Sequence, residues 1–535
     1  MLVRRSLRAF ATSSTQHLSQ RQWRGPLATR CFQSGSSGDD RGSKPAPEDI
    51  TPSSFLKSID LSNPTAEDRG KLSKIIQEVV QTKANTGDFV PRVVIGNLCA
   101  KYKTLNIEEK KQFLLILARD LHVEPALVEQ DLNYFAENFA HVQHDGESHG
   151  QSEIDWQHER IERFLRTFRN LRQSLTPLYE TFFQQVLSQR EGGMLFLVQM
   201  RADLLQVLRK HVDHGSEAAA LRSLDVSLKV SCAPNFLASW FSVGFLQLER
   251  VTYEHSPGRL LEKIIRYEAV HPVGTIIELK RRLGKGRRCF AFFHPSVPDE
   301  PLVFVHVALV EELAAGMPYI KEATENLEDE SSARAAIFYS ISSTQKGLQG
   351  VDLGNFLIKE VAKALKSEHP HLEIFSTLSP IPNFVPWLES QRQNTELVAN
   401  DDRLRALRNM LGSRSTAAST VGTVLDALAV ENWHEDLVLA SALQPILMKL
   451  GARYVYLEKK RGKALCQVAN FHIRNGAIFE RLNWLGDPSP KGLHQSAGLM
   501  VNYKYDLTRV ESNNENYLLN NVIAIGDQPQ QLLSS

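Results

Sequence analysis

The sequence is poor in cysteine, with five in 535 residues and no C-x-x-C pair. Apart from Cys31 near the start, the cysteines are scattered at positions 99, 232, 289 and 466. Structural zinc sites and disulfide scaffolds need closely grouped cysteines, so both are disfavoured. Long apolar runs are also lacking. Because a membrane-spanning helix needs about 18 or more consecutive apolar residues, we expect no membrane partner.

Acidic residues are missing from the first 38 positions, which contain six arginines. On a helical wheel the first ten residues place Val3, Leu7 and Phe10 on one side and Arg4, Arg5 and Arg8 on the other. An Arg-rich, Ser-rich start without acids is typical of a mitochondrial transit peptide, and a disordered basic tail is the alternative. The chain ends in QLLSS rather than in the simple peroxisomal tripeptide. We expect a location in the mitochondrial matrix, and leave a peroxisomal or cytosolic form open.

Neither sign of charge dominates, since 62 basic residues face 61 acidic ones. Loss of residues 1–38 would leave 56 against 61, a net charge of about −5. A slightly acidic protein is a poor candidate for general nucleic-acid binding, and we expect no nucleic-acid partner. Three histidines in residues 141–153 lack the spacing of metal ligands. A solvated loop is the favoured interpretation there, and we expect no metal.

The chain divides by pattern. Residues 39–54, rich in Ser, Gly, Asp and Pro, predict a linker. From 55 to 240 apolar residues recur three and four apart, which predicts an all-helical domain. From 241 to 535 the pattern is mixed, with predicted strands in GTIIELK, RCFAFFH, LVFVHVALV and AAIFYSIS, and helices again between 383 and 450. The fold class we expect is a helical domain followed by an α/β domain.

One glycine-rich segment raises a question of function. TQKGLQGVDLGNFLIKEVAKAL, residues 344–365, joins a predicted strand to a predicted helix. Glycines allow positive φ and close approach of the backbone, and a helix N-terminus favours phosphate. The segment has neither the G-K-[ST] of a Walker loop nor the G-x-G-x-x-G of a dinucleotide fold. Phosphate binding and a purely geometric use of Gly347, Gly350 and Gly354 are both open on this evidence.

Longer motifs narrow the choice. AAIFYSISSTQKGLQGVDLGNFLIKEV, EIFSTLSPIPNF, QVANFHIRNGAIFERLNWLGD and GLMVNYKYDL occur in the order in which similar motifs occur in malonyl-CoA decarboxylases, which this chain resembles. The resemblance implies a helical oligomerisation domain and an acetyltransferase-like catalytic domain. It also implies conversion of malonyl-CoA to acetyl-CoA and CO2 without metal or organic cofactor, and a homo-oligomer, in the family a tetramer.

The same resemblance implies the site residues. The catalytic pair corresponds to Ser379 and His472, and the CoA-contacting turn to Gln349, Gly350, Val351, Asp352, Leu353, Gly354 and Asn355. Ser340 and Tyr505 are further candidates. On pattern alone, Ser379 before Pro380 is typical of a turn and His472 of a core position.

The chemistry of decarboxylation suggests a role for each of these residues. Loss of CO2 leaves an electron pair that the thioester can take as an enolate, and histidine, with a pKa near working pH, can return the proton. We therefore expect His472 to protonate the enolate and Ser379 to orient the malonyl group. The basic run 280–288 could contact CoA phosphates, but a solvated loop is favoured. The alternatives are acyl transfer from CoA on the same fold and a non-catalytic helical interaction protein.

Overall fold

The computed structural model describes residues 59–81, 89–144, 153–189, 192–210, 215–229, 237–325, 329–351, 353–397, 402–412, 415 and 417–534. The predicted transit peptide and the predicted linker lie outside the described residues, as does Asp352. No described helix is long and apolar enough to cross a membrane.

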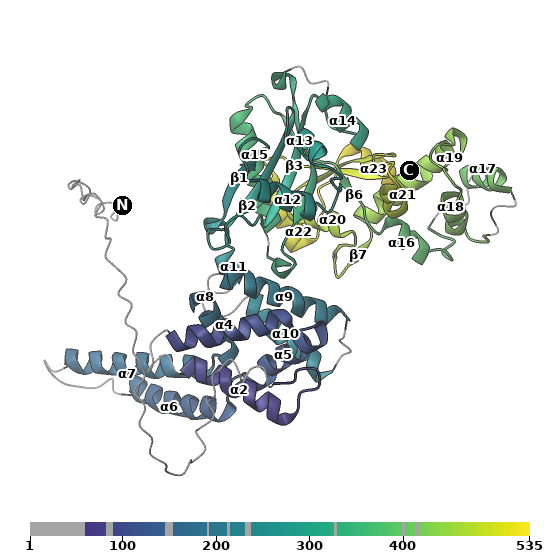
Figure 1. The fold of residues 1–535 in the computed structure, drawn as a ribbon. Coiled ribbons are helices and arrows are strands. Elements are labelled where there is room, and N and C mark those ends of the chain that lie inside the picture. The colour runs from purple at the N-terminus through teal and green to yellow at the C-terminus, as the bar shows by residue number, and fades with distance from the viewer. Residues whose placement is uncertain are drawn as a thin grey trace, which may run out of the picture. The chain divides into compact units, whose positions relative to one another are not determined.

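The first part of the described chain is helical (Figure 1). Its helices are α2 (Ala66–Gln81), α4 (Phe89–Thr104), α5 (Ile107–Asp120), α6 (Pro125–His144), α7 (Glu153–Ser174), α8 (Leu178–Gln189), α9 (Gly193–Lys210), α10 (Ser216–Lys229) and α11 (Leu237–Trp240). The buried run of α5, Phe113 to Ala118, belongs to their shared apolar core. The predicted helical region is confirmed. The loop predicted at 141–153 is wrong for residues 141–144, because α6 continues to His144.

The α/β part begins with a strand at Gln247. Up to the glycine segment its elements are β1 (Gln247–Val251), α12 (Gly258–Tyr267), α13 (Ile276–Arg282), β2 (Arg287–Phe293), β3 (Val303–Val310), α14 (Met317–Glu325), η2 (Glu330–Ser332), β4 (Ala335–Ser343) and η3 (Lys346–Leu348). After it come α15 (Leu353–Glu368), β5 (Ile374–Thr377), β6 (Ser379–Pro380), α16 (Phe384–Ser390), α17 (Asp402–Leu411), α18 (Thr420–Leu428) and α19 (Leu437–Tyr456). The last elements are β7 (Lys459–Lys460), β8 (Lys463–Ala464), α20 (Gln467–Arg474), β9 (Ile478–Asn483), α21 (Pro490–Ser496), β10 (Met500–Lys504), α22 (Val510–Asn520) and α23 (Asp527–Ser534).

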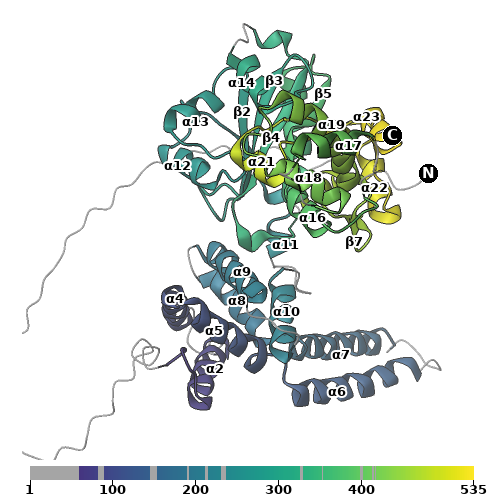
Figure 2. The same cartoon turned by 90° about the vertical axis from the view of Figure 1, so that its right-hand side faces the viewer.

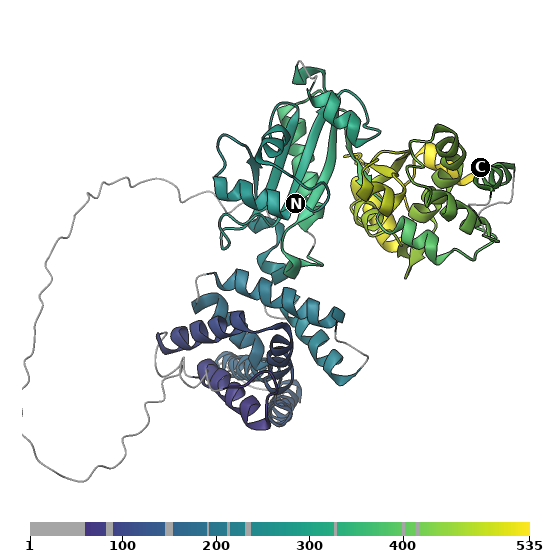
Figure 3. The ribbon, with the colours of Figure 1, turned by 45° about the vertical axis from the view of Figure 1, so that its right-hand side comes forward.

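The strands form one main sheet in the order β1-β2-β3-β4-β5-β10-β6, with β9 beside β10. Strands β2, β3 and β4, teal in Figure 3, lie side by side as antiparallel neighbours. The pair β4–β5 is parallel and is joined through α15. Parallel strands need such a crossover, and their carboxyl ends meet at one edge of the sheet.

Helices cover both faces of this sheet. Alternate residues of β2 divide between them: Cys289 and Ala291 pack with α12 and α13, whereas Phe290 and Phe292 belong to the core that includes α15. Figure 1 shows α12 and α13 over the strands on one face. Burial on both faces accounts for the continuously apolar strands.

Two expectations fail near α13. The segment GTIIELK is a helix rather than a strand, because Thr275 caps the N-terminus with its hydroxyl and Glu278 lies in the first turn. The basic run 280–288 is not a solvated loop. Its first residues belong to α13, and Arg287 and Arg288 are buried on β2.

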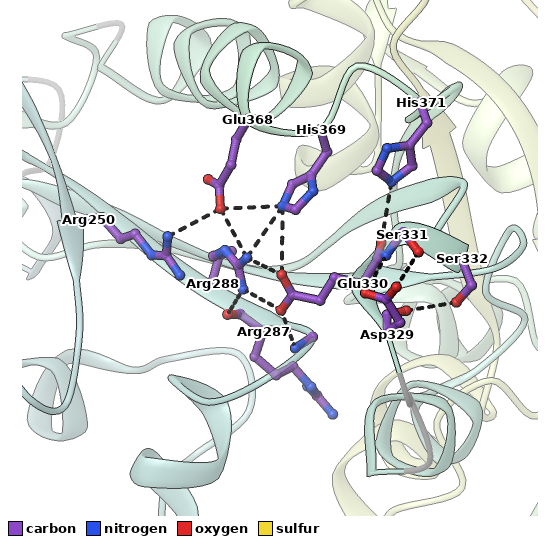
Figure 4. A network of polar contacts seen from close by, with 11 residues as sticks. Arg250, Arg287, Arg288, Asp329, Glu330, Ser331, Ser332, Glu368, His369 and His371 are labelled. Carbon is purple, nitrogen blue, oxygen red and sulfur yellow. Dashed lines mark hydrogen bonds and ion pairs between the residues drawn. The ribbon is translucent and has the colours of Figure 1, made fainter.

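Arg288 is the centre of the polar network in Figure 4. Its guanidinium contacts Glu330 at 2.6 Å and Glu368 at 3.0 Å, and Arg250 of β1 also reaches Glu368. Arg288 holds the pKa of Glu330 down at about 2. Glu368 is the last residue of α15, so the network fixes the end of this helix opposite the glycine turn.

The helices predicted between 383 and 450 are confirmed as α16 to α19, which gather together in Figure 2. They bury leucines and valines such as Leu407, Val424 and Leu443. Their apolar core is continuous with that of the sheet, and includes residues of α20, β9 and β10.

Candidate active site

A cavity of about 250 Å³ lies where β4 and the chain after β5 part. The two strands pair from Ala335–Ile374 as far as Phe338–Thr377. Beyond that point β4 continues to Ser343, while Ser379 and Pro380 form β6 and pair with β10 instead. The cavity is lined by Val270, Phe338, Tyr339, Ser340, Ile341, Ser343, Ser379, Pro380, Gln467, Val468, Phe471 and His472.

Three candidate residues form a hydrogen-bonded chain at this cavity. Ser379 Oγ lies 3.1 Å from His472 Nε2, and His472 Nδ1 lies 2.9 Å from the hydroxyl of Tyr505. A neutral imidazole donates from one nitrogen and accepts at the other. One hydroxyl of the chain therefore donates to the ring and the other accepts from it.

Separate elements hold the three side chains. Ser379 belongs to β6, where it pairs with Val501 of β10, and Tyr505 directly follows β10, where its N–H donates to Phe375. His472 lies in the last turn of α20, and its ring stacks on that of Tyr503 with centroids 4.8 Å apart. Segments more than ninety residues apart in sequence thus meet at one imidazole.

Burial is the main influence on the pKa values of His472 and Tyr505. His472 is 3% exposed, and burial lowers its pKa from 6.5 to about 3. Burial likewise raises the pKa of Tyr505 well above 10. The imidazole of His472 is therefore neutral at physiological pH. The expectation that its pKa lies near working pH does not hold in this structure, because a buried ring loses the hydration of its charged form.

Ser340 lines the same cavity, and a β-bulge explains how. Val307 pairs with Phe338 and His306 pairs with Ser340, so Tyr339 has no partner on β3. The extra residue turns Ser340 toward the face that carries His306. There the Ser340 hydroxyl donates to the carboxylate of Glu268, with Oγ 2.7 Å from Oε1 and 2.8 Å from Oε2.

The glycine turn leaves the same edge of the sheet. Residues 346–348 form η3, Gly350 has φ +82°, and α15 begins at Leu353. Two of the glycines are needed for contacts inside the protein. A Cβ on Gly347 would lie 1.8 Å from the carbonyl oxygen of Val198, and one on Gly354 would lie 2.6 Å from the ring of Phe471. Because Phe471 lines the cavity, Gly354 places the start of α15 against the cavity wall.

Arg201 of α9 also contacts the turn. This guanidinium is 2% exposed and is paired with Asp225. It donates to the carbonyl oxygens of Gly347, at 2.5 Å, and Gln349, at 3.0 Å. Arg209 donates to the side chain of Gln349. Within the turn, the N–H groups of Gln349, Val351 and Leu353 donate to the carbonyl oxygens of Lys346, Leu348 and Val351.

The structure brings four of the eleven candidates together, whereas none of the described turn residues lines the cavity. Ser340, Ser379 and His472 line one cavity, and Tyr505 contacts His472 from behind. Of the turn, Gly354 is tied to that cavity through Phe471. Glu268 and Arg201 were missed by sequence reasoning. A single glutamate and a helical arginine far from the motifs carry no spacing signal that could have revealed them.

Two larger cavities lie elsewhere in the described chain. One, of about 420 Å³, is lined by residues such as Gln185, Gly193 and Trp240, and the other, of about 480 Å³, lies among α6, α7 and neighbouring residues. Neither contains Ser379 or His472, so chemistry rather than size selects the 250 Å³ cavity. Among the described residues no group of three or more His, Cys, Asp or Glu side chains could hold a metal ion.

Comparison with known families identifies the family of the chain. Residues 145–241 match the model of the malonyl-CoA decarboxylase N-terminal domain, and residues 244–535 match that of the C-terminal domain. The chain belongs to the malonyl-CoA decarboxylase family. The family resemblance of the motifs is thereby confirmed.

Individual members of the family are similar over most of their length. "Malonyl-CoA decarboxylase, mitochondrial" of Anser anser anser is 44% identical over 368 residues, covering 68% of this chain and 71% of the relative. The rat protein of the same name is 42% identical over 372 residues, covering 68% of this chain and 73% of the relative.

Solved structures of the family share the fold. The malonyl-CoA decarboxylase of Rhodopseudomonas palustris has a TM-score of 0.67 at 32% identity, covering 87% of this chain and 99% of that one. The enzyme of Agrobacterium vitis gives 0.68 at 30%, covering 87% and 100%. The helical region followed by a mixed α/β domain is thus the fold of the family, whereas the acetyltransferase likeness stays a prediction.

Proposed function

We propose that the protein converts malonyl-CoA to acetyl-CoA and CO2 at the cavity between β4 and β6. The observation that supports this most is the hydrogen-bonded chain Ser379–His472–Tyr505 at the wall of that cavity, in a member of this family. The alternative function, acyl transfer from CoA, would require a second route by which the acceptor could enter the cavity. The family match favours decarboxylation.

The reaction needs an electron sink and a proton. When the bond between the α-carbon and the carboxylate breaks, the electron pair passes to the thioester as an enolate and CO2 leaves. A donor aimed at the developing oxyanion contributes about 3 to 4 kcal/mol in comparable sites. Among the polar groups that line the cavity, we assign these tasks to the hydroxyl of Ser379 and the imidazole of His472, which form the hydrogen-bonded pair.

The proton requires a change at His472. Its imidazole is neutral in the free site, since burial lowers the pKa to about 3. A substrate carboxylate in the cavity favours the protonated ring, because a nearby opposite charge raises the pKa of a histidine. We propose that substrate entry brings the proton to His472, that His472 delivers it to the α-carbon, and that Ser379 orients the malonyl group.

The CoA portion is assigned to the glycine turn. The proposed contacts come from residues 349–355, at the start of α15. Arg201 holds the carbonyls of Gly347 and Gln349, which fixes the conformation of the turn. Because Gln349, Val351 and Leu353 donate their N–H groups within the turn, the proposed donors to pyrophosphate are the N–H of Gly350 and those of the first turn of α15 after Leu353. The side chain of Lys229 adds positive charge beside it, since a Cβ on Gly350 would lie 3.0 Å from Lys229 Nζ.

The products formed from malonyl-CoA distinguish the candidate functions. The full chain is incubated with malonyl-CoA, and CO2, acetyl-CoA and free CoA are measured. Decarboxylation gives CO2 and acetyl-CoA in equal amounts with no acceptor present. Free CoA that appears only when an amine or thiol acceptor is added would indicate acyl transfer instead. A folded protein that binds no CoA would leave the helical interaction protein.

The organisation of the chain belongs to the same proposal. We assign residues 1–38 to a transit peptide, 39–54 to a linker, 55–240 to a helical oligomerisation domain and 241–535 to a catalytic domain. The mitochondrial naming of the relatives supports a mitochondrial location, and we assign the matrix. Fusion of residues 1–38 to a fluorescent protein tests this, because retention of the fusion in the cytosol would contradict it.

A homo-oligomer, in the family pattern a tetramer, is the proposed assembly. Helices α6 and α7 pack together through Phe135, Phe164 and Phe168. Both also expose large apolar side chains, each at least 44% accessible: Leu127, Leu132 and Tyr134 on α6, and Ile161, Leu165 and Phe168 on α7. Exposed apolar side chains on two helices that pack together are typical of a protein–protein contact, and a second copy of the chain is the proposed partner.

A further inference from the structure

A carboxylate is buried directly behind one wall of the cavity. The side chain of Glu268, which follows α12, has no accessible surface. Its Oε1 accepts hydrogen bonds from the backbone N–H groups of Val270, at 2.8 Å, and His271, at 3.0 Å, and from the hydroxyl of Ser340. The hydroxyl of Ser342 is 3.4 Å away. All of these partners donate, which is the environment of an ionised carboxylate.

Among the residues that the structure describes, no lysine or arginine forms an ion pair with Glu268. The one ion-pair contact of Glu268 in the described part of the chain is His306, whose Nε2 lies 3.5 Å from Oε2. Burial lowers the pKa of His306 to about 4, so its ring is neutral at physiological pH. Burial opposes ionisation of Glu268, but the hydrogen bonds from Ser340 and from the N–H groups of Val270 and His271 favour its charged form and hold its pKa below the ordinary value. Glu268 is therefore a buried negative charge.

Ser340 carries this charge to the cavity. A serine hydroxyl has one hydrogen, and that of Ser340 is committed to Glu268, so its lone pairs are the groups left for the cavity that it lines. The β4 wall thus presents an acceptor with a carboxylate behind it. The Ser379–His472 pair lines the same cavity and can donate. A substrate carboxylate in the cavity is therefore repelled by the wall that carries Ser340 and Glu268. It is attracted by the Ser379–His472 pair.

We infer that Glu268, acting with Ser340, disfavours the carboxylate of the bound substrate and thereby promotes the loss of CO2. This inference rests on the proposed decarboxylase function. The substrate enters with its negative charge on the carboxylate, and that group leaves as neutral CO2 while the electron pair moves to the thioester oxygen and a proton reaches the α-carbon. A fixed negative charge near the carboxylate raises the ground state more than the transition state, which increases kcat.

The test separates charge from shape. Glu268→Gln keeps the size of the side chain and removes the charge. We expect kcat for CO2 release to fall at least about tenfold and the KM for malonyl-CoA to fall with it, the pattern of lost ground-state strain. Acetyl-CoA lacks the carboxylate, so its inhibition constant should change less than about twofold.

A second variant covers the case in which Glu268→Gln does not fold. Ser340→Ala removes the acceptor from the wall and leaves the carboxylate in place, and we expect changes of the same direction but smaller size. Glu330→Gln is the matched control: its carboxylate is held by Arg288 in the network of Figure 4 and is not part of the cavity lining. It should leave the ratio of the malonyl-CoA KM to the acetyl-CoA inhibition constant unchanged.

The outcomes are distinct. If Glu268→Gln and Ser340→Ala weaken malonyl-CoA and acetyl-CoA equally, or leave kcat unchanged, Glu268 has a structural role and the inference is overturned. If the native chain releases no CO2 from malonyl-CoA, the proposed function itself fails, and this is seen before any variant is compared.

Discussion

The imidazole of His472 has two hydroxyl partners, and the one on Nδ1 orients the ring. Tyr505 makes that contact at 2.9 Å from a fully buried position. Tyr505→Phe removes the partner and leaves the ring in place. Because a hydrogen bond on Nδ1 fixes the orientation of the imidazole that is proposed to deliver the proton, we expect kcat to fall about tenfold or more while CoA binding is retained.

Tyr503→Phe is the control for that measurement. Tyr503 stacks on the same imidazole, but its hydroxyl has no hydrogen-bond partner among the described residues. Loss of this hydroxyl should change kcat less than about twofold, since the stacking ring remains. Equal losses of kcat in the two variants would show that Tyr505 contributes through packing and not through its hydrogen bond to His472.

The depressed pKa of His472 predicts a pH dependence of stability. The folded pKa is about 3 and the unfolded value about 6.5. Above pH 6.5 both states are neutral at this residue. Between these values the unfolded chain binds a proton that the folded chain does not, so stability falls as the pH falls. At pH 5 this loss is about 2 kcal/mol.

Denaturant unfolding at pH 8 and pH 5 measures this effect. The native chain should lose about 2 kcal/mol more between the two values than His472→Gln does, because glutamine takes up no proton. Identical pH dependence in the two proteins would mean that the ring of His472 is protonated, or open to water, in the folded state.

At the scale of elements, the glycine turn depends on a helix distant in sequence. Arg201→Met removes the donor to the carbonyls of Gly347 and Gln349, so the turn can rotate its peptides. We expect the KM for malonyl-CoA to rise about tenfold with little change in kcat, the result of lost uniform binding.

Malonyl-pantetheine makes this prediction specific, since it lacks the pyrophosphate. Its kinetics should be the same in Arg201→Met and the native chain. Arg222→Met, at an exposed position on α10, is the control and should behave as native with both substrates. An equal rise in KM with malonyl-CoA and with malonyl-pantetheine would mean that Arg201 stabilises the fold rather than the CoA-binding turn.

Several elements could be predicted from local pattern, and others could not. The strand, glycine turn and helix from 335 to 368 carry their own periodicity and turn residues. The strand predicted in GTIIELK, residues 274–280, is wrong: its isoleucines suggest a strand, but the cap by Thr275 favours the helix α13. The parting of β4 and β5 after Phe338 and Thr377, which makes the cavity, depends on β10 and has no local signal.

At the scale of the whole molecule, the apolar surface of α6 and α7 predicts assembly. Ile161 is 57% exposed and Leu165 is 44% exposed, and both lie on α7. The double variant Ile161→Glu, Leu165→Glu places charges in the proposed contact, so we expect a smaller species in sedimentation velocity. The same assembly size in both proteins would assign the contact to another surface.

The order of domains and the identity of the family could be recognised in the sequence, because helical periodicity and the long motifs are local properties. The surroundings of Ser379 and His472 could not be recognised in the sequence. The loss of hydration that lowers the histidine pKa, the carboxylate of Glu268 and the support of the turn by Arg201 all arise when distant segments pack together.

The most direct test is CO2 release from malonyl-CoA by the full chain beside His472→Ala, with CoA binding measured for both. The account predicts CO2 and acetyl-CoA from the native chain, and a loss of kcat of about 100-fold or more in the variant with CoA binding retained. A His472→Ala protein that still releases CO2 at the native rate would contradict it, since no other described group contacts Ser379 as this imidazole does.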